Sequence, residues 1–196
     1  MTTDISASLA QRLKTETHAQ HERMHGLMEQ GQPFADRTRY ARFVAAQYLF
    51  QRDVEQLFAD PAVRTAVPDL DSRGRSAVSL LDLHDLGATQ PDDAIASQCV
   101  QMPAALGWLY VSEGSTLGAA FLFKEARAKL GLDETFGARN LAAYPEGRAQ
   151  AWRRFLAALQ ESGLNEAEQA EVVQGAHAAY DRFGALLETH LLATQP

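Results

Sequence analysis

The chain has 196 residues, 46% of them hydrophobic, and a formal net charge of −7 at pH 7. This length and composition predict a single domain over residues 1–196 with an ample apolar core. The negative charge argues against nucleic acid and against an anionic membrane as partners. The N-terminal residues lack the basic start and apolar run of a secretory signal. The single cysteine, Cys99, excludes an internal disulfide and fits a reducing compartment, so we expect a cytoplasmic protein.

Helical periodicity dominates the sequence and strand-like alternation is nearly absent, so we expect an all-α, single-domain helical bundle. Asp36 is the expected N-cap of the second helix, and Asn165 followed by Glu168 resembles a capping box that opens the last helix. Residues 131–145 form the longest expected loop. The expected helices cover residues 5–30, a stretch from 37 to beyond 50, and about 73–81, 91–99, 103–131, 147–161 and 165–192.

Two glycines four residues apart, Gly114 and Gly118, lie in the most apolar of these helices and share one of its faces. Each costs about 1 kcal/mol of helix stability relative to alanine. A helix that carries this cost twice indicates either a bend or the close approach of another group to its backbone.

Four interpretations of this glycine pair are open. A transmembrane dimerisation face is disfavoured, because Glu113 would lie near the centre of the bilayer. Close packing against another helix and an incidental pair of glycines both remain. The fourth is a flat ligand lying on the exposed backbone, and the small hydroxyl side chains of Ser112, Ser115 and Thr116 favour it, because they offer hydrogen bonds without bulk.

Three histidines, His18, His21 and His25, lie in the first expected helix. A lone histidine on an apolar helix face is usually a satisfied core residue, but His21 and His25 form an i,i+4 pair. In such a pair His21 could bind a metal through one nitrogen while His25 accepts a hydrogen bond from the other. Lys14 precedes His21 by seven residues, about 10 Å along a continuous helix, and could meet an acidic group at the edge of a large planar cofactor or simply extend into water.

Two other metal sites are conceivable here. Glu22 and His25 have the Glu-x-x-His spacing of di-iron carboxylate proteins, but that site needs a second copy of the motif, which the sequence lacks. The three histidines could instead bind zinc, but their spacing on one helix does not close a tetrahedron.

Four segments, in order along the chain, resemble the heme oxygenases of bacteria. They are His21 with its leading LKTET, ARFVAAQYLFQRDVEQLF, GWLYVSEGSTLGAAFLFKEA and DETFGARNLA, and the resemblance extends from Leu9 to Leu187. It implies a bundle in which haem is sandwiched between the first (proximal) helix and a glycine-kinked distal helix. It also implies the oxidative cleavage of haem, which is both substrate and cofactor, to biliverdin, carbon monoxide and ferrous iron.

The resemblance also assigns residues. His21 is the implied iron ligand, His25 its hydrogen-bonding partner, and Gly114 and Gly118 the distal glycines. Ser115 stands where mammalian members carry an aspartate that orders the distal water. The remaining implied assignments are a distal water network of Gln47, Arg73 or Arg75, Thr116 and Trp152, and propionate contacts from Lys14, Tyr110 and Arg182.

Cleavage uses O2, and we expect electrons from an external donor, either a ferredoxin, a flavodoxin or an NADPH-dependent reductase, because no flavin or dinucleotide motif is found. A bacteriophytochrome that receives biliverdin is a further expected partner, and we expect no membrane anchor. The alternatives are a haem carrier or sensor with this fold, and a di-iron oxidase on it. Lys14, together with Glu125 at the position where some relatives carry a late distal lysine, predicts cleavage mainly at the α-meso carbon.

Overall fold

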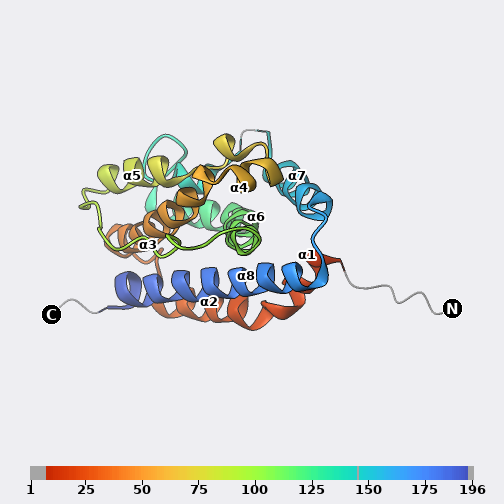
Figure 1. The fold of residues 1–196 in the computed structure, drawn as a ribbon. Coiled ribbons are helices and arrows are strands. Elements are labelled where there is room, and N and C mark those ends of the chain that lie inside the picture. Colours follow the sequence, from red (N-terminus) through yellow and green to blue (C-terminus); the bar gives the residue numbers. More distant parts are fainter. Residues whose placement is uncertain (1–7, 145, 194–196) are drawn as a thin grey trace.

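The computed structural model describes residues 8–144 and 146–193, and this part of the chain is helical without a named β-strand (Figure 1). The all-α prediction is therefore confirmed. The α-helices are α1 (Leu9–Glu16), α2 (His18–Gly31), α3 (Arg37–Gln56), α4 (Pro61–Ala66), α5 (Ser76–Asp85), α6 (Ala104–Leu130), α7 (Arg148–Glu161) and α8 (Glu166–Leu187). Three 3-10 turns at Leu57–Ala59, Leu70–Ser72 and Asn140–Ala142, and a π-helical turn at Glu188–Leu192, complete the described elements.

Helices α2 and α8 lie side by side along one side of the molecule, with α3 and α6 in the middle and α4, α5 and α7 on the other side (Figure 1). The two helices run in the same direction. Near the start of α2, Gln20 Nε2 lies 2.6 Å from His177 Nδ1, and Arg23 further along pairs with Glu188 at 2.7 Å. Helix α8 thus packs against α2 and supports it.

Helix α6 packs on α8 with its backbone in direct contact. A Cβ atom built on Gly107 would lie 2.0 Å from the carbonyl oxygen of Val172, and one built on Gly175 would lie 2.0 Å from that of Ala104. No side chain fits there, because real Cβ contacts are longer than 3 Å. The close helix packing that we considered for Gly114 and Gly118 is therefore found at a different pair of glycines.

The single first helix expected over residues 5–30 is wrong, because the structure has two helices separated at Thr17. The Thr17 backbone has φ −102° and ψ 9°, and its buried hydroxyl donates to the Leu13 carbonyl oxygen at 2.7 Å. Such a hydrogen bond from a threonine side chain competes with the regular helix and bends it. Residues 5–7 of the expected helix lie outside the described residues.

The helix expected over residues 91–99 is also wrong, since this segment is irregular and ends in a turn. Some of its polar groups bind other helices. The Ala96 N–H donates to the Asp53 carboxylate at 3.3 Å, and Asp93 pairs with Arg182 at 3.0 Å. Apolar spacing alone carried no information about these partners.

The helix expected near residues 73–81 begins later, at Ser76 in α5. Glu55 on α3 accepts hydrogen bonds from the N–H groups of Arg75 and Ser76 at 2.5 and 2.7 Å, which caps the helix at this point. Arg73 and Arg75 lie before the helix with buried side chains. The short helix α4 had no counterpart among the expected helices.

The other boundaries agree with the sequence. Asp36 caps α3 by accepting from the Arg39 N–H at 2.8 Å, and Asn165 and Glu168 form both hydrogen bonds of a capping box. The loop over 131–145 is irregular apart from its 3-10 turn, with position 145 outside the described residues.

Candidate functional site

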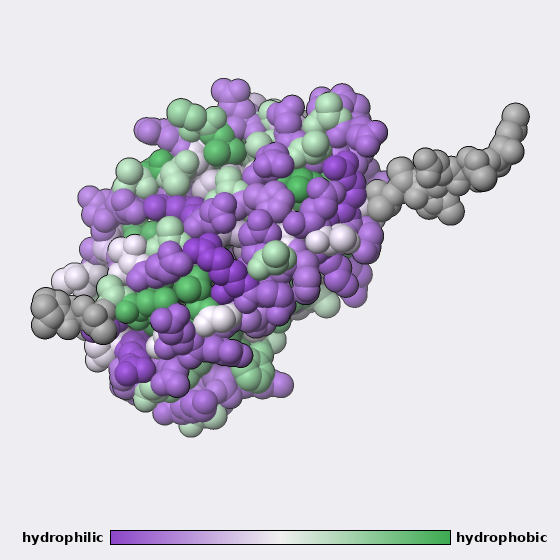
Figure 2. All heavy atoms as spheres, turned by 90° about the horizontal axis from the view of Figure 1, so that it is seen from below, coloured by the Kyte–Doolittle hydropathy of each residue, from purple (hydrophilic) through white to green (hydrophobic). Residues whose placement is uncertain are grey.

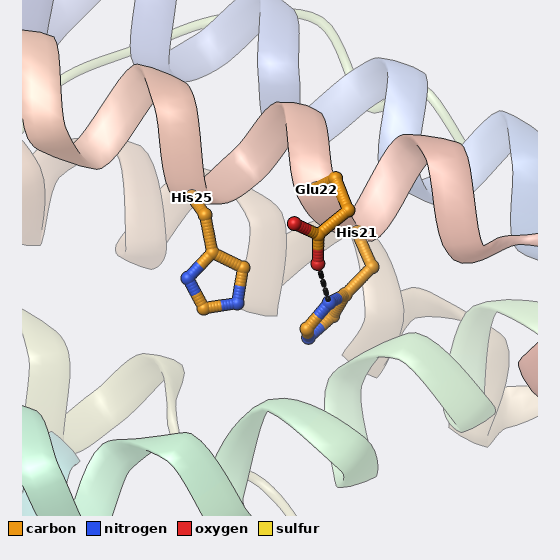
Figure 3. A group of neighbouring side chains, drawn as sticks. All are labelled: His21, Glu22 and His25. Carbon is orange, nitrogen blue, oxygen red and sulfur yellow. Dashed lines mark ion pairs between the residues drawn. The ribbon is translucent and has the colours of Figure 1, made fainter.

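His21 and His25 project from the same side of α2 towards α6 (Figure 3). Met24 and Leu27, on the other face of the helix, are buried and hold α2 against the core. The His21 side chain remains 54% exposed, and its ring centroid lies 4.6 Å from that of His25. These are not satisfied core histidines, since both are exposed and the His21 imidazole forms no hydrogen bond with any described residue.

Two neighbouring side chains, those of Tyr180 and Glu22, contact the His21 ring. The Tyr180 ring on α8 meets it edge to face, with centroids 6.5 Å apart, and the Glu22 carboxylate lies 3.5 Å from Nδ1 (Figure 3). The two imidazoles contact each other edge to face without a hydrogen bond between them in this structure. The predicted hydrogen bond from His21 to His25 is thus not formed here.

The opposing face of α6 is open and apolar. Apart from its chain neighbours and the nearby backbone of α6, a Cβ atom built on Gly118 would meet no described atom within 4 Å. Leu117 and Phe121, one turn apart on the same helix, are 41% and 65% exposed, which is unusual for side chains of this size. A flat apolar group lying on this face would cover both side chains and rest on the bare backbone at Gly118.

Trp152 closes the space at Gly114. A Cβ atom on Gly114 would lie 3.7 Å from the tip of the Trp152 ring, which in turn packs against Tyr110 with centroids 5.5 Å apart. Tyr110, Gly114 and Trp152 are therefore brought together at one end of the open α6 face. Helix α6 is helical without interruption through both glycines.

A buried polar network holds the middle of α6 in place. Glu113 is 1% exposed, accepts from Arg73 Nη1 at 2.5 Å and from the Tyr144 hydroxyl at 2.6 Å. Burial and the Glu113 carboxylate raise the pKa of Tyr144 well above its usual value, so Tyr144 keeps its proton. Arg75 Nη2 continues the network to the Ser112 hydroxyl at 2.9 Å. Arg73 or Arg75 was predicted for a distal water network, and both lie against the buried Glu113 carboxylate, at 2.5 and 3.8 Å.

Three further predicted network residues use their polar groups within the protein. The Ser115 hydroxyl donates to the Ser112 carbonyl oxygen and the buried Thr116 hydroxyl to that of Glu113, each at 2.6 Å. Gln47 on α3 accepts from the Asn140 side chain at 3.0 Å. Of Ser112, Ser115 and Thr116, whose hydroxyls were expected to face a ligand, only Ser115 is an exposed residue.

Of the two cations predicted to contact the haem propionates, Lys14 is free of ion pairs with described residues and Arg182 is already paired. Lys14 is exposed, has no ion pair with a described residue, and lines a hollow of about 260 Å³ together with His18. The bend at Thr17 separates Lys14 from the helix that carries His21. Arg182 pairs with the buried Asp53 at 2.7 Å and with Asp93 at 3.0 Å, so its propionate role stays a prediction in competition with two carboxylates.

Sequence reasoning did not identify Tyr144, Asn140 or Tyr180 as site residues. A signal for the buried network was nevertheless present, because a carboxylate such as Glu113 in an apolar helix requires a buried cation. The tyrosines carried no such signal.

The donor chemistry of this space fits haem. A neutral imidazole is a preferred ligand of iron, and a porphyrin needs apolar surface on both sides of its plane. The structure provides the half-exposed His21 on one side and the bare backbone of Gly118 with Leu117 and Phe121 on the other.

The model of the heme oxygenase family matches residues 88–189 of the chain. The heme oxygenase PigA of Pseudomonas aeruginosa is 49% identical over 181 residues, which cover 91% of each chain. The chain belongs to the heme oxygenase family. A heme oxygenase of Xanthomonas campestris is 30% identical over 80% of this chain and 93% of that protein. The solved NO- and CO-bound heme oxygenase of Neisseria meningitidis superposes with a TM-score of 0.89 at 34% identity, covering 96% of this chain and 94% of the other.

The predicted activity and cofactor are thereby confirmed. The chain is an enzyme that cleaves haem to biliverdin, carbon monoxide and ferrous iron, with haem as both substrate and prosthetic group. The more distant cyanobacterial heme oxygenase of Synechocystis, at 15% identity and a TM-score of 0.77, supports the fold alone. The di-iron alternative finds no support among the described residues, whose one cluster of His, Cys, Asp or Glu with metal-binding spacing lies on a single helix.

The surface of this heme oxygenase is mixed in character. On the face drawn in Figure 2, apolar residues gather in patches among mostly hydrophilic ones. Within residues 8–144 and 146–193, no helix combines the length and the apolar character needed to cross a bilayer.

Proposed function

We propose that this heme oxygenase binds haem between α2 and α6 with His21 as the axial ligand of the iron. The observation that carries the proposal is the pairing of a half-exposed His21 with a Gly118 whose missing side chain leaves open space. His25, in ring contact with His21, and Tyr180 behind it restrict the orientation of the ligating ring.

The distal side of the proposed site is shaped by small residues. When bound, haem supplies the iron at which O2 is reduced and also the ring that is oxidised. Gly118 leaves room for O2 and water beside the helix backbone, and the hydroxyl oxygen of the exposed Ser115 can accept a hydrogen bond from such a water. The ion pair between Arg73 and Glu113 keeps this part of α6 fixed, while Tyr110 and Trp152 wall off one end.

We further propose that the α-meso carbon is the main site of cleavage and that electrons come from an external donor. Lys14, free of ion pairs with described residues, is available to attract a propionate and so to set the rotation of the ring. The repulsion expected from Glu125 is weaker than the sequence indicated, because Glu125 pairs with Lys129 at 2.6 Å. The α preference therefore depends mainly on Lys14.

Chromatography of the product against the four biliverdin isomers tests this orientation. We expect mainly α-biliverdin from the wild-type protein and an increased β and δ fraction from Lys14→Asn. A loss of about 1.4 kcal/mol in propionate binding would change the isomer ratio about tenfold. Lys124→Asn removes an exposed cation from α6 and serves as the matched control, with an unchanged ratio. A dominant β or δ product from the wild type would contradict the orientation.

A further inference from the structure

The histidine pair of α2 has a second chemical capacity. Residues 21–25 read His-Glu-Arg-Met-His, which is the H-E-x-x-H spacing that places two imidazoles on one helix face for zinc binding. The structure has both imidazoles on the same side of α2, with the Glu22 carboxylate next to His21 (Figure 3).

The donor atoms are already close to one another. One ligand atom from each of His21, Glu22 and His25 lies within 4.8 Å of the other two, and His21 Nδ1 lies 3.5 Å from Glu22 Oε1. A tetrahedral zinc ion with bonds of about 2.0–2.1 Å requires donor atoms about 3.3 Å apart. Side-chain rotations are needed to reach this spacing; all three residues are exposed, and the ring contacts of His21 with His25 and Tyr180 leave its solvent side open.

The surrounding charges also permit a cation here. Arg23, the nearest cation in the sequence, pairs with Glu188 at 2.7 Å and faces Asp181 at 3.8 Å on α8. Two imidazoles and one carboxylate form a donor set suited to divalent transition-metal ions, with water in the remaining positions. Mg²⁺ and Ca²⁺ prefer oxygen donors throughout and are disfavoured.

We propose that the haem-free protein binds one divalent transition-metal ion through His21, Glu22 and His25, and that this ion and haem exclude each other. The exclusion rests on the proposed function, in which His21 is the axial ligand, whereas the metal site itself does not. Haem and the metal ion thus compete for His21 on α2, and free metal ion lowers the apparent affinity of the protein for haem.

Calorimetric titration of the haem-free full chain with Zn²⁺ tests the site, and Co²⁺ gives an independent ligand-field spectrum. We expect one equivalent of Zn²⁺ bound by the wild type, affinity lowered at least tenfold in His25→Ala and in Glu22→Gln, and no binding of Mg²⁺. His18→Ala removes another exposed histidine of α2 and is the matched control, with unchanged affinity. Equal affinities in the wild type, His25→Ala and Glu22→Gln, or no Zn²⁺ binding, would overturn the metal site and leave the proposed function intact.

A haem titration followed by its absorbance tests the exclusion. Zn²⁺ at ten times its Kd should raise the apparent Kd for haem about elevenfold in the wild type. In His25→Ala the same Zn²⁺ concentration should have a much smaller effect. If Zn²⁺ binds at these residues and haem affinity does not change, the exclusion is overturned, and with it the axial role of His21, while the metal site stands.

Discussion

Gly107 and Gly175 bring the backbones of α6 and α8 into contact, so that a Cβ atom on either would lie 2.0 Å from a carbonyl oxygen of the other helix. The contact fixes the start of α6, and the open face around Gly118 follows three turns later. The glycines of α6 thus have two different roles, one in packing and one in leaving space.

Gly107→Ala should destabilise the protein strongly, because the added methyl group meets the Val172 carbonyl oxygen and the helices must move apart. Overpacking of this kind costs about 3 kcal/mol or more. Denaturant unfolding of the haem-free protein measures the loss. An unfolding free energy within about 0.5 kcal/mol of the wild type would show that the two helices are not in backbone contact.

Gly118→Leu should have the opposite effect on stability. Beyond its chain neighbours and the nearby backbone of α6, no described atom lies within 4 Å of the added Cβ, and replacing a helix-interior glycine stabilises by up to about 1 kcal/mol. Haem turnover should fall at least tenfold with haem still bound, because the side chain fills the space proposed for O2. Gly26→Leu, at a helical glycine of α2 that is equally unobstructed, is the control and should gain stability without losing turnover. A fully active Gly118→Leu enzyme would refute the distal role of this face.

The helical fold was largely accessible from the sequence, because caps and apolar spacing are local signals. Asp36 and the Asn165–Glu168 capping box both marked true helix starts. Local signals could not reveal that Thr17 divides the first helix, or that the Ala96 N–H donates to Asp53 on α3 in a segment that forms no helix. Both outcomes involve specific hydrogen bonds, which the spacing of apolar residues does not report.

The site was predictable where a residue type is chemically distinctive. His21 and His25 stand out in the sequence as a histidine pair at i,i+4, and Gly118 stands out as a glycine in the interior of an apolar helix. The sequence did not show that Arg73 would be used to balance Glu113, nor that Tyr180 would lie against His21, because both contacts join segments far apart in the chain.

The stability of the protein should fall at alkaline pH partly through Tyr180. Burial, with a smaller contribution from Tyr110, raises the pKa of Tyr180 to about 12, while an unfolded tyrosine ionises near pH 10. Between these values the unfolded chain binds fewer protons than the folded one, so the free energy of unfolding decreases as pH rises from about 10 to about 12. Tyr180→Phe should make this decrease shallower without abolishing it, because burial also raises the pKa of Tyr40 and Tyr144. An unchanged slope in denaturant titrations across this range would refute the assignment.

Imidazole rescue of turnover is the sharpest test of whether His21 holds the iron of haem beneath the open face of α6. His21→Ala should bind some haem through apolar contacts, lose biliverdin formation, and recover part of it when imidazole is added. His25→Ala should lower turnover by only about tenfold, the lower end for a residue that orients a ligand. Normal turnover and a normal haem spectrum in His21→Ala, together with their loss in His18→Ala or His25→Ala, would show that His21 is not the iron ligand.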